Sequence, residues 1–149
     1  MPSSKTLSLS PQDPEINPEI DLQQLVGQLM LTFNACACRK NSQMVNNIRE
    51  QMAVHTDKLM LACVIGNLLY NTIVRTENDF IEVSAKSFSH VTLIHIRKSE
   101  NLFEEDIAKS FMPVKALAER LGGCISVSSH RTKGTTVAFT FLNTPQAAA

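Results

Sequence analysis

Two stretches of the chain repeat apolar residues at three- and four-residue spacing, the period of one face of an α-helix. In the first, about residues 19–38, acidic Glu19 and Asp21 suit a helix N-terminus, and the apolar face comprises Leu22, Leu25, Val26, Leu29 and Phe33. The second begins at Thr56 or Asp57, either of which can cap a helix, and its stripe comprises Leu61, Val64, Ile65, Leu68, Leu69, Thr72 and Ile73. So wide a stripe must lie against a sheet or another helix.

The period changes to two after residue 79, as in β-strands. Residues 80–86 and 91–97 alternate in this way and predict an antiparallel hairpin joined by residues 87–90. Residues 124–129 and 135–142 predict a second pair of strands around a turn that holds Lys133 and Gly134. Two short runs, 43–49 and 52–54, predict further strands before the second helix.

Between the two hairpins the pattern is helical again. Residues 104–109 predict a helix, Pro113 interrupts or restarts it, and a second stripe over 114–121 stops at Gly122 and Gly123. The order of elements predicts an α+β fold, a two-layer sandwich with helices on one face of a mixed, mostly antiparallel sheet.

The ends of the chain have a different composition from the middle. Residues 1–18 hold four of the six prolines and few large apolar groups, so we expect an extended or disordered N-terminal lead. Residues 19–143 form one continuous patterned block, and residues 144–149 a short tail. At 149 residues the chain is most simply one domain.

Composition excludes several classes of function. Fourteen basic and fourteen acidic residues give a formal net charge of zero, so no global field attracts nucleic acid or an anionic membrane. No stretch approaches the roughly 20 apolar residues that span a bilayer, and the first residues lack the layout of a secretory signal, so we expect a cytoplasmic protein. The spacing of the four cysteines fits no metal site or disulfide framework, and no metal is expected.

Three motifs carry a family resemblance: Asn-Leu-Leu-Tyr-Asn at 67–71, Leu-Ala-Glu-Arg-Leu-Gly-Gly at 117–123, and Lys-Gly-Thr-Thr at 133–136. Together they resemble the ATP-binding domain of sensor histidine kinases, in the wider superfamily that includes gyrase and MutL. The resemblance spans about Asp21 to Leu142. It implies the Bergerat fold of that superfamily, which agrees with the two-layer sandwich predicted from periodicity.

The two asparagines lie four residues apart and therefore share a helix face. Their amide oxygens could serve a magnesium ion together with phosphate oxygens. The resemblance implies that Asn71 corresponds to the metal-coordinating residue of the family and Asn67 to its upstream partner. The other interpretation is that both simply occupy a polar edge of the helix.

Three departures from the family pattern concern the same ligand. The lysine that faces the phosphates is replaced by Val74. The aspartate that accepts a hydrogen bond from adenine is replaced by Arg97, which can only donate, and its two glycines are replaced by Ser99 and Asn101. The lid and its glycine motif are deleted, because the next helix follows Phe111 almost at once. We therefore expect no cofactor and no catalytic residue, with Asn67 and Asn71 as vestigial Mg-ATP positions.

The leading hypothesis is a degenerate histidine kinase-like ATPase domain that acts by protein contact in bacterial two-component or phosphorelay signalling. Its partner would be a histidine kinase, a receiver domain or another signalling protein, and a homodimer is possible. The contact surface left open by the missing lid would include Tyr70, Val74, Leu102, Phe103 and Met112.

Two alternatives remain open. The first is a divergent but active catalytic domain that uses Asn71 for Mg-ATP and basic residues such as Arg75, Arg97 or Lys115 for the phosphates. The second is an unrelated α+β module whose motifs match by chance.

Overall fold

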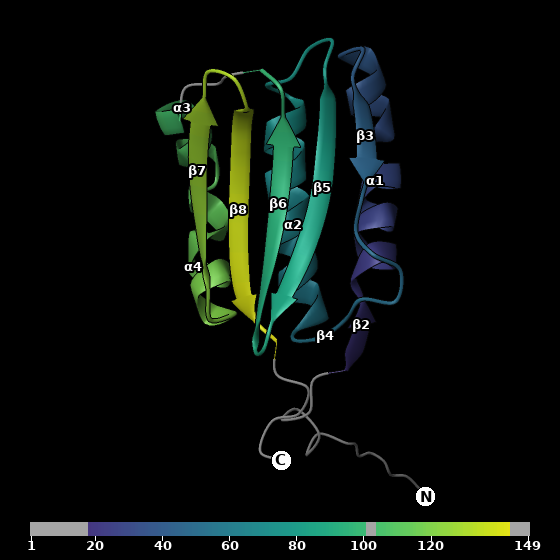
Figure 1. Cartoon of the computed structure of the whole chain (residues 1–149), viewed down its shortest axis with the longest axis vertical. Coiled ribbons are helices and arrows are strands. Elements are labelled where there is room, and N and C mark those ends of the chain that lie inside the picture. The colour runs from purple at the N-terminus through teal and green to yellow at the C-terminus, as the bar shows by residue number, and fades with distance from the viewer. Residues whose placement is uncertain (1–17, 101–103, 144–149) are drawn as a thin grey trace, which may run out of the picture.

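A five-stranded sheet with all the main helices on one face forms the body of the protein (Figure 1). The computed structural model describes residues 18–100 and 104–143. The strand order across the sheet is β3 (Gln43–Asn46), β5 (Phe80–Phe88), β6 (Val91–Lys98), β8 (Gly134–Leu142) and β7 (Cys124–His130). Only β3 and β5 are parallel, and the other neighbours are antiparallel. The predicted α+β sandwich and both hairpins are confirmed.

The helices line up behind the sheet in the order α1 (Leu22–Arg39), α2 (Lys58–Ile73), then α3 (Glu104–Ser110) with α4 (Met112–Arg120) (Figure 1). Asp57 is the N-cap of α2, and its side chain accepts a hydrogen bond of 3.0 Å from the Met60 backbone N–H. Every residue of the predicted α2 stripe is buried. The stripe therefore faces the sheet, as its width required.

The start of the first helix differs from the prediction. Glu19–Asp21 is a short strand, β2, that pairs with β4 (Ala53–His55), and the helix begins only at Leu22. Asp21 is the N-cap and accepts a 3.1 Å hydrogen bond from the Gln24 backbone N–H. Because the carboxylate satisfies a helix N–H from outside the helix, the acidic residues mark the boundary and do not lie within the first turn.

The strand predicted over residues 43–49 is also shorter than expected. It ends at Asn46, whose side-chain Oδ1 accepts a 3.2 Å hydrogen bond from the Ile48 backbone N–H. An Asn side chain that bonds two residues ahead bends the chain into a turn. The run predicted at 52–54 is a strand displaced by one residue.

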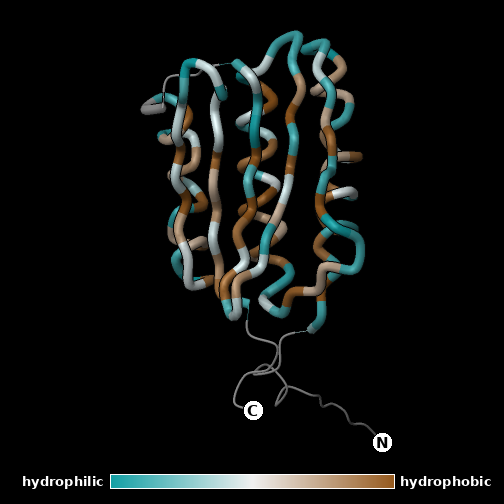
Figure 2. Tube along the Cα trace, viewed as in Figure 1, coloured by the Kyte–Doolittle hydropathy of each residue, from teal (hydrophilic) through white to brown (hydrophobic). Residues whose placement is uncertain are grey.

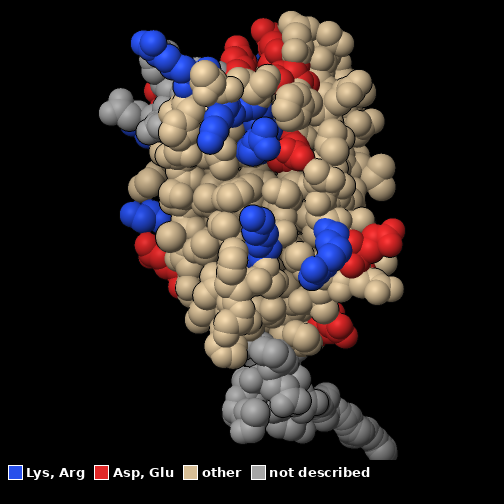
Figure 3. Space-filling view, viewed as in Figure 1, with Lys and Arg blue, Asp and Glu red and all other residues tan. Residues whose placement is uncertain are grey.

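The core lies between the sheet and the helices, and it is mostly aliphatic, with Phe111, Phe139 and Phe141 among its buried residues. Hydropathy alternates along the strands (Figure 2). Val83, Ile96 and Val137 are register neighbours on β5, β6 and β8, and all three are buried. None of the described helices lies on the opposite face of the sheet, and basic and acidic side chains are scattered over it among uncharged residues (Figure 3).

Candidate functional site

The two asparagines of α2 lie at the end of the helix that approaches β5 and the end of β6. The Asn71 Nδ2 donates to the Asn67 backbone carbonyl at 3.0 Å, within the helix. The Asn71 Oδ1 lies 3.4 Å from Nη1 of Arg75, which also donates to the Asn71 backbone carbonyl at 3.1 Å. A guanidinium therefore stands beside the oxygen that would otherwise be available to a metal ion.

Asn67 differs from Asn71 in one respect. Its Oδ1 is buried and has no hydrogen-bond partner among the described residues. An unpartnered buried acceptor costs free energy comparable to a lost hydrogen bond. The atom is thus a buried acceptor that no donor among the described residues satisfies.

Lys98, the last residue of β6, points into the helix side of the sheet. Its side chain is 1% exposed, although it carries a charge. The Nζ atom donates to the Arg75 backbone carbonyl at 3.0 Å and to the Glu100 carboxylate at 3.0 Å. A cation near the carbonyls that end a helix is stabilised by the helix dipole, so Lys98 ties the end of β6 to the end of α2.

Arg97 points the opposite way. Its Nη1 donates to the Glu82 carboxylate on β5 at 3.1 Å, across the face of the sheet that carries no helix. Arg97 therefore does not lie on the side of the sheet that holds Asn67 and Asn71, because successive strand residues point to opposite faces. Among the described residues at the end of β6, Lys98 is the one on the same side as Asn67 and Asn71.

The two-residue period could have identified Lys98 from the sequence. Ile94 and Ile96 are buried on the helix side, and residue 98 continues the same phase. A charged residue in a buried phase is unusual unless it is paired. The sequence analysis did not identify Lys98, because it placed the family aspartate by counting backward from residue 104, and this count led to Arg97.

Only Phe111 separates α3 from α4, so the described chain holds no lid between these helices. Phe111 is buried and its backbone N–H bonds the Ala108 carbonyl at 3.1 Å. Val74, at the position of the family lysine, is the half-buried C-cap residue of α2 and its backbone N–H bonds the Tyr70 carbonyl. Phe111 therefore contributes to the packing of the helices, and Val74 ends α2.

The residues predicted to form a contact surface have different neighbours. The Tyr70 ring packs against Phe33 of α1, with ring centroids 5.8 Å apart. Met112 is exposed at the start of α4, where it lines a hollow beside β7. Leu102 and Phe103 lie outside the described residues. The structure thus places Tyr70 toward α1 and Met112 toward the opposite end of the helix layer.

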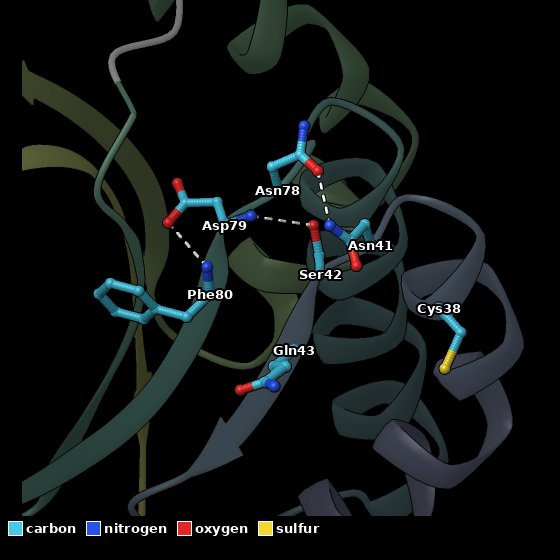
Figure 4. Close-up of a pocket in the computed structure, with 7 residues that line it drawn as sticks. All are labelled: Cys38, Asn41, Ser42, Gln43, Asn78, Asp79 and Phe80. Carbon is cyan, nitrogen blue, oxygen red and sulfur yellow. Dashed lines mark hydrogen bonds between the residues drawn. The ribbon is translucent and has the colours of Figure 1, made fainter.

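A polar hollow of about 590 Å³ lies where the turn after α1 meets the turn after α2 (Figure 4). Asn41 donates to the Asn78 side-chain oxygen at 2.7 Å, and these residues hold φ values of 53° and 55°. Asn tolerates this left-handed conformation better than most residues. The polar groups join two turns that are 37 residues apart in the sequence.

Asp79 is the most heavily bonded residue of this hollow. Its carboxylate accepts from Ser99 Oγ at 2.6 Å, from the Phe80 backbone N–H at 2.7 Å and from the Glu100 backbone N–H at 3.0 Å. Asp79 therefore holds the chain immediately after Lys98 against the start of β5. Sequence reasoning did not identify this contact, because the partners are about 20 residues away.

Acid should weaken this contact. Partial burial raises the pKa of Asp79, but the hydrogen bonds from Ser99, Phe80 and Glu100 and the charge of Lys98 outweigh burial and hold the pKa below its ordinary 3.8. A depressed pKa stabilises the folded state above the unfolded value, and this contribution is lost as pH falls through the folded pKa. We expect the urea concentration at the unfolding midpoint to decrease as the pH is lowered below about 4. The decrease should be smaller for Asp79→Asn than for the unchanged protein. Glu77→Gln, at an exposed acid two residues before Asp79, is the control, and an equal change in both variants would contradict the prediction.

No group of three or more His, Cys, Asp or Glu side chains that could hold a metal ion occurs in residues 18–100 and 104–143. The four cysteines are free thiols. No helix in the same ranges is long and apolar enough to cross a membrane.

No family model matches the sequence, and a search of curated proteins finds no match. Solved structures do match. The nucleotide-free catalytic domain of histidine kinase ThkA aligns with a TM-score of 0.74 and 19% identity, over 86% of this chain and 98% of that one. In the complex of ThkA with response regulator protein TrrA, the chain covers 42% of the longer kinase, with a TM-score of 0.73 and 20% identity over 87% of this chain.

Two further kinases give the same result. The histidine kinase AdeS of Acinetobacter baumannii aligns with a TM-score of 0.70 and 18% identity, over 89% of this chain and 70% of that one. Full-length ShkA in complex with AMPPNP aligns with a TM-score of 0.71 and 15% identity, over 89% of this chain and 32% of that one. At these identities the likeness concerns the fold. The chain therefore has the fold of the histidine kinase catalytic domain, the histidine kinase-type ATPase fold.

Proposed function

We propose that this chain is a degenerate histidine kinase-like ATPase domain that does not bind ATP and acts by protein contact in bacterial two-component or phosphorelay signalling. The observation that carries the proposal is Lys98, a buried cation bonded to the Arg75 carbonyl on the side of the sheet that holds Asn67 and Asn71. In the family this region must offer an acceptor to the adenine amino group, and an ammonium offers only donors.

The groups that remain do not fit Mg-ATP. Magnesium needs oxygen ligands that are free to approach it, whereas the Asn71 oxygen has the Arg75 guanidinium at 3.4 Å. The direct joining of α3 to α4 around Phe111 leaves no lid to cover phosphates. Each of these features opposes the same ligand, and together they support the loss of nucleotide binding.

Protein contact is the remaining use of the fold. ThkA, which shares the fold, is known in complex with the response regulator TrrA. By this analogy the proposed partner is a histidine kinase, a receiver domain or another cytoplasmic signalling protein. Homodimerisation is a further form of the same proposal.

Calorimetry with Mg-ATP tests the loss of binding. We expect no dissociation constant tighter than about 1 mM, and no thermal stabilisation at saturating Mg-ATP. ShkA, which has been seen with AMPPNP, is the positive control. Binding tighter than 1 mM that weakens on Asn71→Ala would overturn the proposal.

One observation favours the alternative of a divergent, active ATP-binding domain. The Oδ1 of Asn67 is buried without a partner and could accept a hydrogen bond from a ligand or a magnesium-bound water. If this alternative holds, Asn67→Leu should abolish nucleotide binding. If the domain instead does not bind ATP, Asn67→Leu removes a buried unpaired acceptor and should leave the free energy of unfolding unchanged or higher.

A further inference from the structure

The strand β7 is the outermost strand of the sheet and pairs with β8 alone among the described strands. An outer strand exposes backbone N–H and C=O groups along its free edge, and proteins usually protect such edges with charged residues, proline or a covering element. Residues 124–128 read Cys-Ile-Ser-Val-Ser and contain neither charge nor proline. This stretch therefore lacks the usual side-chain protection against another strand.

A hollow of about 240 Å³ lies between this edge and the helices α3 and α4. Ile125 and Val127 line it from the strand and are only half-buried, although both point toward the helix layer. The helices contribute apolar Ala108, Phe111 and Met112, and Met112 is 59% exposed. The free edge and the apolar hollow are thus continuous, and we call them the β7 edge groove.

We propose that the β7 edge groove binds an extended, uncharged segment of a partner protein as an additional strand. An added strand would bond the free backbone edge, and its residues on the helix side would recur about 6.8 Å apart. Ile125 and Val127 have the same two-residue spacing, so two apolar side chains of the segment would enter the hollow beside them. This is strand addition, in which backbone pairing supplies affinity and side-chain pockets supply specificity.

Size and charge select this occupant. The hollow is smaller than the about 300–1,000 Å³ of small-molecule sites, which suits a pair of side chains better than a free ligand. Its charged lining residues, Lys115 and Glu119, have opposite signs, and residues 124–128 are uncharged. A segment with a net charge would gain no electrostatic attraction from lining residues of opposite sign. An uncharged segment would bind without any electrostatic penalty.

The inference rests on the proposed role in protein contact and not on the loss of ATP binding. Calorimetric detection of Mg-ATP binding would leave it standing. Failure of segment binding would, in turn, leave the nucleotide proposal standing.

The test uses the full chain and a labelled synthetic peptide with the sequence of residues 135–141, joined to a Gly-Ser tail. The sequence is uncharged and alternates apolar and small residues. In the protein it belongs to β8, which pairs with the inner edge of β7. We expect a dissociation constant below about 1 mM by fluorescence anisotropy, with slower amide exchange at residues 124–128. A peptide of the same composition with its apolar residues adjacent should bind at least about tenfold more weakly.

Two variants locate the binding. Met112→Glu puts a charge into the groove at the first turn of α4, where an acid suits the helix, and should weaken binding at least about tenfold. Leu31→Glu, at a leucine of α1 that is 78% exposed, is the matched control and should leave binding unchanged. Equal effects of the two variants would overturn the proposal.

Three other results would also overturn it. The first is no peptide binding at 1 mM by a monomeric protein. The second is a concentration-dependent dimer in which residues 124–128 are protected without peptide, because the occupant would then be a second copy. The third is tighter peptide binding after Leu7→Asp with Leu9→Asp, because the chain's own N-terminal sequence would then be competing for the groove.

Discussion

Replacing Lys98 with aspartate is expected to destabilise the protein by about 3–5 kcal/mol. The side chain is buried, and its Nζ bonds the Arg75 carbonyl and the Glu100 carboxylate. A carboxylate there would lie against two acceptors with no donor and would remain an uncompensated buried charge. Urea unfolding at neutral pH measures the change.

Arg97→Asp is the matched control for this variant. It makes the same change of charge one residue earlier, where the side chain is 46% exposed and pairs with Glu82 on the other face of the sheet. An exposed pair contributes about 1 kcal/mol or less, so the control should change stability little. Equal losses for the two variants would contradict the orientation of Lys98 and, with it, the main support for the loss of adenine recognition.

Lys98→Met separates burial from charge. A buried ionic group can often be exchanged for an apolar one of similar size at little cost, so we expect Met to be far less harmful than Asp. If Lys98→Asp were instead tolerated and the variant bound Mg-ATP, the site would still accept the acid that binds adenine in the family. The loss of ATP binding would then depend on the single residue Lys98.

Gly123→Ala is expected to cost about 3 kcal/mol, at the upper end of overpacking effects. A Cβ at this position would overlap the Thr140 backbone carbonyl and come within 2.9 Å of the Phe141 Cα. Because these are backbone atoms of β8, no side-chain rotation relieves the clash. The variant should loosen the pairing of β7 with β8, which thermal unfolding and amide exchange in these strands would detect.

Gly27→Ala provides the comparison for Gly123→Ala. Gly27 lies inside α1, and a Cβ there would meet only the Asn46 Nδ2 at the ordinary distance of 3.6 Å. Alanine in a helix interior is favoured over glycine by about 0.5–1 kcal/mol, so this variant should be neutral or more stable. A loss of stability is thus expected at Gly123 and none at Gly27, and a loss at Gly27 comparable to that at Gly123 would contradict the packing described.

Helix α2 shows how far sequence reasoning reached at the candidate site. Its buried stripe followed from spacing alone, because a helix of 16 residues repeats its pattern several times, whereas the sequence left the cap open between Thr56 and Asp57. The bonds of Asn71 did not follow, because Arg75 one turn later can reach either solvent or the Asn71 oxygen. Local spacing set which residues share a face, but packing set what each side chain touches.

The sequence by itself determined the elements other than β2, their order and the likeness to the histidine kinase ATPase fold, since periodicity and motif spacing are properties of the chain. Tertiary structure alone decided that Lys98 bonds the Arg75 carbonyl after α2, that Asp79 holds the segment after β6, and that residues 124–128 of the outermost described strand lie beside an apolar hollow. Each of these depends on contacts between residues about 20 or more positions apart, or on which strand is outermost. Such contacts arise only when the layers pack, because the hydrophobic pattern shows which face of a strand is buried but not which neighbour covers it.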